Sequence, residues 1–233
     1  MAIKALLRER FLLLLPFLLA LSLTGCQTTS GQLGAIEDAW KLTFAPSKID
    51  TSSLPKQYEY LLIHGGVKPT LMGLGKRTQT NTPQGLVEDE YWFSAQGELL
   101  VLRNGRIHTV FGLPVEWRSN QSSPPTWQQT IDSQQVTSWA RVRDELPNYR
   151  FGISDKIHTT LLASPPKLDS IAIDLAPASN SQLQWIQDTI ETSNDKGQRW
   201  VFKQVFAIER NLMVYSEQCI SPKYCLRIQR VKR

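Results

Sequence analysis

The sequence predicts a mainly β protein whose antiparallel, curved sheets form a sandwich or a partly open barrel, with one short N-terminal helix. Apolar and polar residues alternate in the segments that begin at Tyr149 and Trp200, as they do in strands with one buried face. Asn104-Gly105 separates two apolar runs, and this dipeptide is the strongest short-range signal of a β-hairpin. Because these runs are apolar on both faces, we expect the sheet to be covered on both sides.

The expected helix lies near the N-terminus. Ile36, Ala39, Trp40 and Phe44 recur at helical spacing and would form one apolar face. Pro46 follows them, and a proline ends a helix because it has no backbone N–H to donate. The pattern therefore predicts one short amphipathic helix before the strands begin.

The central hairpin can be aligned from its turn. Pairing across the Asn104-Gly105 turn places Leu102 opposite Ile107 on one face and Leu99 opposite Val110 on the other. Further strands are predicted in the second half of the chain, namely 149–163, 200–209, one beginning at residue 212, and 226–231. The segment 193–197 is typical of a longer turn between two of them.

The first residues look like a lipoprotein signal. Leu23-Thr24-Gly25-Cys26 resembles a bacterial lipobox, where the signal is cut before a cysteine that is then acylated. The apolar core from Phe11 to Leu23 has thirteen residues, fewer than the ~20 that a membrane-spanning helix needs. We expect a signal peptide over residues 1–25, lipidation at Cys26, a tether over 26–34 and a single mainly-β periplasmic domain over 35–233. The alternative is an uncleaved anchor with an incidental cysteine.

The expected location follows from the residue after the cysteine. In bacterial lipoproteins an Asp at that position favours retention in the inner membrane, and this chain has Gln27 there. By this analogy the protein is lipid-anchored in the outer membrane and faces the periplasm. Without residues 1–25 the chain has 23 basic and 20 acidic residues, a net charge of +3. That charge is too small to indicate nucleic-acid binding, but it is compatible with an anionic polysaccharide.

Two further cysteines are expected to pair with each other. Cys219 and Cys225 bracket a short loop in a compartment that permits disulfides. The alternative is a metal site, but no His or Cys partner lies near them in the sequence. The spacing therefore predicts a disulfide that closes a hairpin loop.

The sequence contains no catalytic motif that we would defend. His64, His108 and His158 are scattered, and neither an HExxH, a CxxC nor a GxSxG pattern occurs. The acidic run Glu88-Asp89-Glu90 offers carboxylates, but consecutive residues of a strand point to opposite faces, so we expect a solvated sheet edge. We therefore expect a protein that is not an enzyme and that has neither a cofactor nor a metal site.

Tryptophans are the strongest candidates for a binding role. The chain has seven, and aromatic rings can stack on sugar rings or anchor a protein interface. The alternative is packing in the core, where aromatic residues are common in β structure. Trp117 and Trp127 flank a polar, proline-rich loop, and this position makes them our candidates for an exposed contact with a polymer or a partner.

The order of several short motifs resembles a known family. These motifs are the lipobox, Leu54-Pro55, Tyr58, Gly65-Gly66, Trp92 with Gly97, Asn104-Gly105-Arg106-Ile107, Thr109, Gly112-Leu113, Trp127, Thr130-Ile131-Asp132 and Tyr149. Together they resemble the outer-membrane lipoproteins of group 4 capsule and exopolysaccharide operons (GfcB/YjbF-like). The resemblance covers most of the chain after the lipobox and does not include the two C-terminal cysteines.

The resemblance implies a role in polysaccharide export or assembly, with an outer-membrane barrel or a polysaccharide export protein as possible partners. It supplies no catalytic residues. We therefore expect a non-enzymatic accessory protein or binding scaffold. The alternative is a lipoprotein-carrier-like module that holds an acyl chain or a segment of an outer-membrane barrel in an apolar concavity. A third class, a glycan hydrolase, needs two carboxylates that face each other in a cleft.

Overall fold

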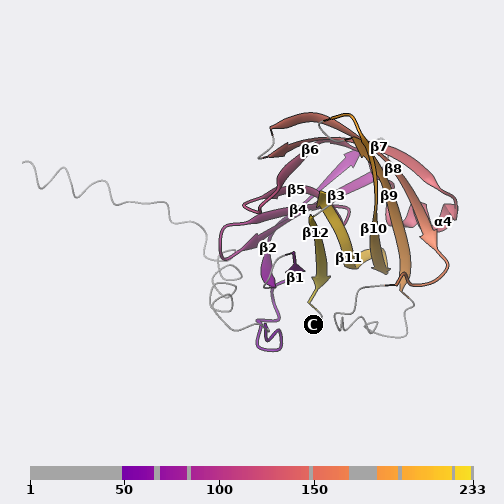
Figure 1. Cartoon of the computed structure of the whole chain (residues 1–233). Coiled ribbons are helices and arrows are strands. Elements are labelled where there is room, and N and C mark those ends of the chain that lie inside the picture. The colour runs from indigo at the N-terminus through magenta and orange to yellow at the C-terminus, as the bar shows by residue number, and fades with distance from the viewer. Residues whose placement is uncertain are drawn as a thin grey trace, which may run out of the picture. The chain divides into compact units, whose positions relative to one another are not determined.

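The residues that the structure describes form a closed β-barrel with one short helix (Figure 1). The structure is a computed structural model that describes residues 49–65, 69–82, 85–146, 149–167, 183–193, 196–221 and 224–231. The predicted signal peptide, Cys26, the tether and the N-terminal helix lie outside the described residues.

Twelve antiparallel strands follow one another around the barrel, and a single helix interrupts them between β6 and β7. The elements are β1 (Tyr60–His64), β2 (Thr70–Thr82), β3 (Gly85–Ser94), β4 (Leu99–Arg103), β5 (Arg106–Phe111), β6 (Glu116–Ser122), α4 (Trp127–Ser133), β7 (Thr137–Leu146), β8 (Arg150–Leu162), β9 (Gln184–Ser193), β10 (Arg199–Glu209), β11 (Leu212–Ser221) and β12 (Tyr224–Arg230).

The barrel closes because the last strand pairs with the first. Each strand pairs with its neighbours in the sequence, and β12 also pairs with β1, with Ile63 opposite Ile228. Closure removes the exposed strand edges through which sheets associate. The mainly β, antiparallel prediction is confirmed, and the barrel is closed rather than partly open.

The predicted hairpin at Asn104-Gly105 is present. Asn104 has φ 46° and Gly105 has φ 76°, the positive values that the favoured two-residue hairpin turn requires. Gly105 is also required by packing, since a Cβ there would lie 2.8 Å from the Cβ of Met213. Leu102 lies opposite Ile107, as the sequence predicts.

The predicted pairing of Leu99 with Val110 is wrong. The register shifts by one residue between Val101 and Leu102, so Leu100 lies opposite Val110 instead. An extra residue in one strand reverses which side chains face inward beyond it. As a result, Leu100 and Val110 join Leu102 and Ile107 in one core.

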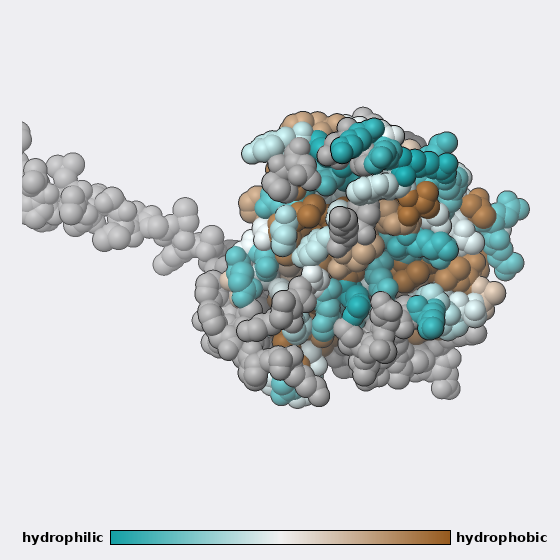
Figure 2. Space-filling view, in the orientation of Figure 1, coloured by the Kyte–Doolittle hydropathy of each residue, from teal (hydrophilic) through white to brown (hydrophobic). Residues whose placement is uncertain are grey.

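The core lies inside the barrel, and all strands except β7 and β8 contribute buried residues to it. Its members are buried residues of β1 to β6, α4 and β9 to β12: Leu61, Ile63, Met72, Trp92, Leu100, Leu102, Ile107, Val110, Trp117, Trp127, Ile186, Phe206, Ile208, Met213, Ile220, Leu226 and Ile228. On the face seen in Figure 2, hydrophilic and hydrophobic residues are interspersed.

The predicted disulfide is confirmed. Cys219 and Cys225 lie directly opposite each other on β11 and β12 and are bonded. This bond closes the hairpin at what we call the disulfide end of the barrel, where β5 also connects to β6. We call the opposite end the α4 end; the β2–β3, β4–β5 and β10–β11 turns and α4 lie there.

His108 makes the stability of the barrel depend on pH. Burial, and then the nearby guanidinium of Arg103, lowers its pKa from 6.5 to about 4. Between these values the unfolded chain binds more protons than the folded chain, so the free energy of unfolding decreases as the pH falls. The contribution of this residue is at most about 3 kcal/mol.

We therefore expect the urea midpoint of the protein to fall when the pH is lowered from about 7 to about 4. His108→Gln should reduce this fall, because glutamine does not titrate. Denaturation curves of both proteins at matched pH values measure the difference. Equal pH dependence in the two proteins would show that His108 is not responsible.

Candidate functional site

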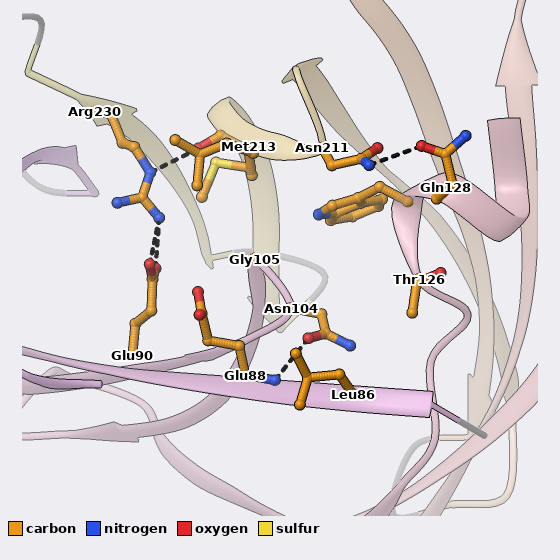
Figure 3. Close-up of a pocket in the computed structure, with 12 residues that line it drawn as sticks. Leu86, Glu88, Glu90, Asn104, Gly105, Thr126, Gln128, Asn211, Met213 and Arg230 are labelled. Carbon is orange, nitrogen blue, oxygen red and sulfur yellow. Dashed lines mark hydrogen bonds and ion pairs between the residues drawn. The ribbon is translucent and has the colours of Figure 1, made fainter. Parts of the chain in front are cut away.

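A pocket of about 250 Å³ lies at the α4 end (Figure 3). Five separate segments contribute to its lining: Leu86, Glu88 and Glu90 from β3; Asn104 and Gly105 from the β4–β5 turn; Thr126, Trp127 and Gln128 from the start of α4; Asn211, Leu212 and Met213 from the β10–β11 turn and the start of β11; and Arg230 from β12. We call it the α4-end pocket. It combines apolar side chains with amides, a hydroxyl and charged groups.

The alternation of β3 places two carboxylates at the pocket. Glu88 and Glu90 share one face of the strand and line the α4-end pocket, while Asp89 points to the other face and is held by Arg103. The expected alternation is therefore correct. The expected solvated edge is wrong for Glu90, which is only 2% exposed, because the pairing of distant strands brings a guanidinium to it.

The β4–β5 turn is bonded to β3, and these bonds hold one wall of the pocket. The Asn104 side-chain oxygen accepts a hydrogen bond from the Glu88 backbone N–H at 2.9 Å. The Asn104 backbone N–H in turn donates to the Glu88 carbonyl at 2.8 Å. These two hydrogen bonds thus fix Asn104 and Glu88 relative to each other at the pocket wall.

The start of α4 forms the opposite wall of the pocket. Thr126 is the N-cap, and it forms a capping box with Gln129. The Asn211 side-chain amide donates to the Gln128 side-chain oxygen at 2.7 Å, which ties the helix to the β10–β11 turn. This helix is not among the elements predicted from the sequence. Its start signal is nevertheless recognisable, because Thr126 follows two prolines and Gln129 lies three residues further on.

Neither predicted tryptophan is an exposed surface residue. Trp127 is 5% exposed and Trp117 is 3% exposed. The expectation that they lie on the surface is wrong, because their side chains turn into the barrel on either side of the proline-rich loop. The structure does not bring them together in one site: Trp127 lines the α4-end pocket, whereas Trp117 stacks on the guanidiniums of Arg141 and Arg143.

Trp127 is held firmly at the pocket wall. Its ring centroid lies 5.1 Å from that of Phe206, and the guanidinium carbon of Arg106 lies 3.9 Å from its centre. Arg106 is itself fixed by Asp188 at 2.7 Å. The indole is therefore a rigid surface that requires no ordering when a ligand arrives.

A cluster of charged residues lies beneath the carboxylate side of the pocket. The Arg230 guanidinium donates to both oxygens of Glu90, at 2.7 and 2.5 Å, and to the Met213 carbonyl at 2.9 Å. Arg77 forms ion pairs with Glu88 at 3.4 Å and with Glu90 at 2.8 Å. Glu59 contacts both arginines, at 3.1 Å for Arg77 and 3.3 Å for Arg230.

A second pocket of about 220 Å³ adjoins the first. The two share Leu86, Asn104 and Thr126, and the second continues along the other face of β3 past Asp89 and Arg103. Its lining also includes hydroxyl-bearing residues of β2, of the end of β6 and of the loop before α4, namely Thr80, Thr82, Ser122 and Ser123. The two pockets thus combine uncharged hydroxyl and amide groups with charged side chains.

Two further groups of charged side chains are buried among β5 and β7 to β9 and do not line the pocket. Arg106 pairs with Asp188, and Asp155 accepts hydrogen bonds from Arg141 and Arg143. Burial opposes ionisation of Asp155, but the two guanidiniums outweigh it and lower its pKa below the usual 3.8. These groups help to hold strands together in the interior.

The described residues contain no group of three or more His, Cys, Asp or Glu side chains that could hold a metal ion. In the same part of the chain, no helix has the length and apolar character to span a membrane.

The comparisons with known proteins concern the fold alone. No family model and no curated protein matches the chain. Among solved structures, the chain is similar to the hypothetical lipoprotein YmcC from Escherichia coli, with a TM-score of 0.60 and 13% sequence identity. The similarity covers 89% of this chain and 99% of that one. The two chains therefore share a fold over nearly their full lengths.

Proposed function

We propose that this protein is an outer-membrane lipoprotein that binds a segment of polysaccharide in the α4-end pocket and assists polysaccharide export or assembly without catalysing a reaction. The lipobox at Cys26 supports the lipid anchor, and so does the shared fold with a protein described as a lipoprotein. The resemblance to the lipoproteins of capsule and exopolysaccharide operons supports the polymer.

The composition of the pocket is the observation that carries the proposed binding. Glycans present hydroxyl groups, which need donors and acceptors, and C–H faces, which pack on apolar surfaces. The pocket supplies the first through Asn104, Thr126 and Gln128 and the second through the exposed Leu86 and Leu212 and the small accessible parts of Trp127 and Met213. At about 250 Å³ it is smaller than typical pockets for whole small molecules, so it suits a short stretch of a longer chain.

The carrier-like alternative receives less support. An acyl chain needs an apolar concavity, whereas the rim of the α4-end pocket carries Glu88, Glu90 and Arg230. Within the described residues, the interior of the barrel is filled by its own core. We therefore do not propose a lipid cargo.

Deleting the gene should reduce surface or secreted polysaccharide, and the purified protein should bind fragments of that polymer without shortening them. Gln128→Ala should weaken binding severalfold, because it removes an exposed amide from the pocket wall and with it the hydrogen bond that ties α4 to the β10–β11 turn. Gln135→Ala changes another exposed glutamine, just beyond α4, and is the control that should bind normally. Unchanged polysaccharide output in the deletion strain, or cleavage of the polymer by the protein, would refute the proposal.

The lipid anchor has its own test. We expect Cys26→Ser to leave an unprocessed precursor without lipid, because acylation requires the thiol at the cut site. Mass spectrometry of the N-terminal peptide and membrane fractionation measure this result. Normal cleavage and normal membrane attachment of the variant would contradict the anchor.

A further inference from the structure

We infer that the α4-end pocket takes a neutral, hydroxyl-rich stretch of glycan and discriminates against stretches that carry carboxylate, sulfate or phosphate groups. This inference rests on the proposed function and adds the chemical class of the ligand. Three features of the pocket carry it: the carboxylate partners of its arginines, the partly exposed carboxylate of Glu88, and the neutral groups on its opposite wall.

The arginine of the pocket already holds a carboxylate. The Nη2 atom of Arg230 donates to both Glu90 oxygens, its Nη1 donates to Glu59 at 3.3 Å, and its Nε donates to the Met213 carbonyl. Strong binding of an anion to arginine requires paired N–H donors that can face the anion. An anionic ligand would therefore have to displace a protein carboxylate from Arg230.

The two neighbouring arginines, Arg103 and Arg77, are also paired with carboxylates of the protein. Arg103 donates to the two oxygens of Asp89, with both bonds at 2.8 Å. Arg77 donates to Glu59 at 3.2 and 3.1 Å and to Glu90 at 2.8 Å. All three arginines around the two pockets are thus engaged by carboxylates of the barrel itself.

Glu88 presents a carboxylate of the charged cluster to the pocket. The carboxylates of Glu59, Glu88 and Glu90 share the guanidiniums of Arg77 and Arg230, and the ion pair of Arg77 with Glu88, at 3.4 Å, is longer than its pairs with the other two. Glu88 lines the pocket, and its side chain is 29% exposed. An anionic ligand group near Glu88 is repelled, whereas a sugar hydroxyl can donate to the same carboxylate.

The opposite wall of the pocket is uncharged. In Figure 3, Thr126 and Gln128 lie across the pocket from Glu90 and Arg230. The Gln128 amide oxygen accepts from Asn211 and the Thr126 hydroxyl accepts from Gln129, but each oxygen has a second lone pair that can accept from a sugar hydroxyl. The pocket therefore offers complementary partners to a neutral glycan and repulsion to an acidic one.

The test uses full-length protein in an uncharged detergent and the exported polysaccharide of the producing strain. The polymer is fragmented and separated by anion exchange into neutral and acidic pools of matched length, and part of the acidic pool is carboxyl-reduced to neutral sugars. Calorimetry should show about tenfold or greater preference for the neutral pool at low salt. The preference should shrink at about 1 M salt, where charges are screened within about 3 Å.

Two variants and the carboxyl-reduced pool then test whether Glu88 causes the preference for neutral fragments. Glu88→Gln should lower the preference for the neutral pool severalfold, because it removes the negative charge that faces the ligand while keeping the shape of the side chain. Glu116→Gln, at the disulfide end, is the matched control and should keep the full preference. Carboxyl reduction should raise the affinity of the acidic fragments.

Two results would overturn this inference and leave the proposed function in place. One is equal or tighter binding of the acidic pool to the wild-type protein, and the other is an unchanged preference for the neutral pool in Glu88→Gln. Failure of all three pools to bind the wild-type protein would overturn the proposed function and this inference together.

Discussion

Asp155→Asn is expected to lower the free energy of unfolding by about 3–5 kcal/mol. One oxygen of Asp155 accepts hydrogen bonds from Arg141 at 2.9 and 2.6 Å and from Arg143 at 2.9 Å, and the residue is fully buried. The two arginine side chains are only 4% and 2% exposed. Removing the carboxylate leaves buried positive charge with too little compensation, which costs far more than an ion pair at the surface.

Urea denaturation at neutral pH measures this loss. Asp132→Asn makes the same chemical change on the exposed face of α4 and should alter stability by less than about 0.5 kcal/mol. Because the pKa of Asp155 is lowered on folding, its contribution is present above about pH 4 and is lost as the pH falls further. The difference between wild type and Asp155→Asn should therefore narrow in acid. A loss below about 1 kcal/mol would show that other groups compensate the two arginines.

Trp127→Ala is expected to cost about 3–5 kcal/mol, because it leaves a cavity in the core and removes the ring that packs on Phe206 and Arg106. This residue was first identified from the sequence as an exposed contact, for which an alanine change would affect binding alone. Its burial reverses that expectation. The variant should lose stability and polymer binding together, since the indole also lines the pocket.

Two further variants separate these effects. Trp127→Phe keeps an aromatic ring and should retain most of the stability. Trp200→Ala removes a tryptophan that is only partly buried, so it should cost clearly less than Trp127→Ala. Thermal or urea denaturation of the three variants gives the order. A Trp127→Ala protein as stable as wild type would mean that the indole does not hold α4 against the barrel.

The sequence was sufficient to identify the parts of the site that depend only on residues adjacent in the chain. Asn104-Gly105 forms the predicted turn because its positive φ angles are a property of those two residues. The alternation of Glu88, Asp89 and Glu90 follows from the pleat of a strand. The helix that begins after Thr126 has a local capping signal but was not predicted, and the bulge that changed the pairing of Leu99 was not predicted either.

The sequence by itself therefore determined a mainly β chain, its central hairpin and its disulfide, because alternation, turn chemistry and short spacing all act within a few residues. Only the tertiary structure decided that β12 closes the barrel onto β1 and that Trp127 is buried. It also brought Arg230 to Glu90, which lies 140 residues away in the chain. Such pairings depend on which distant strands become neighbours, and the periodicity of a single strand carries no record of its neighbours.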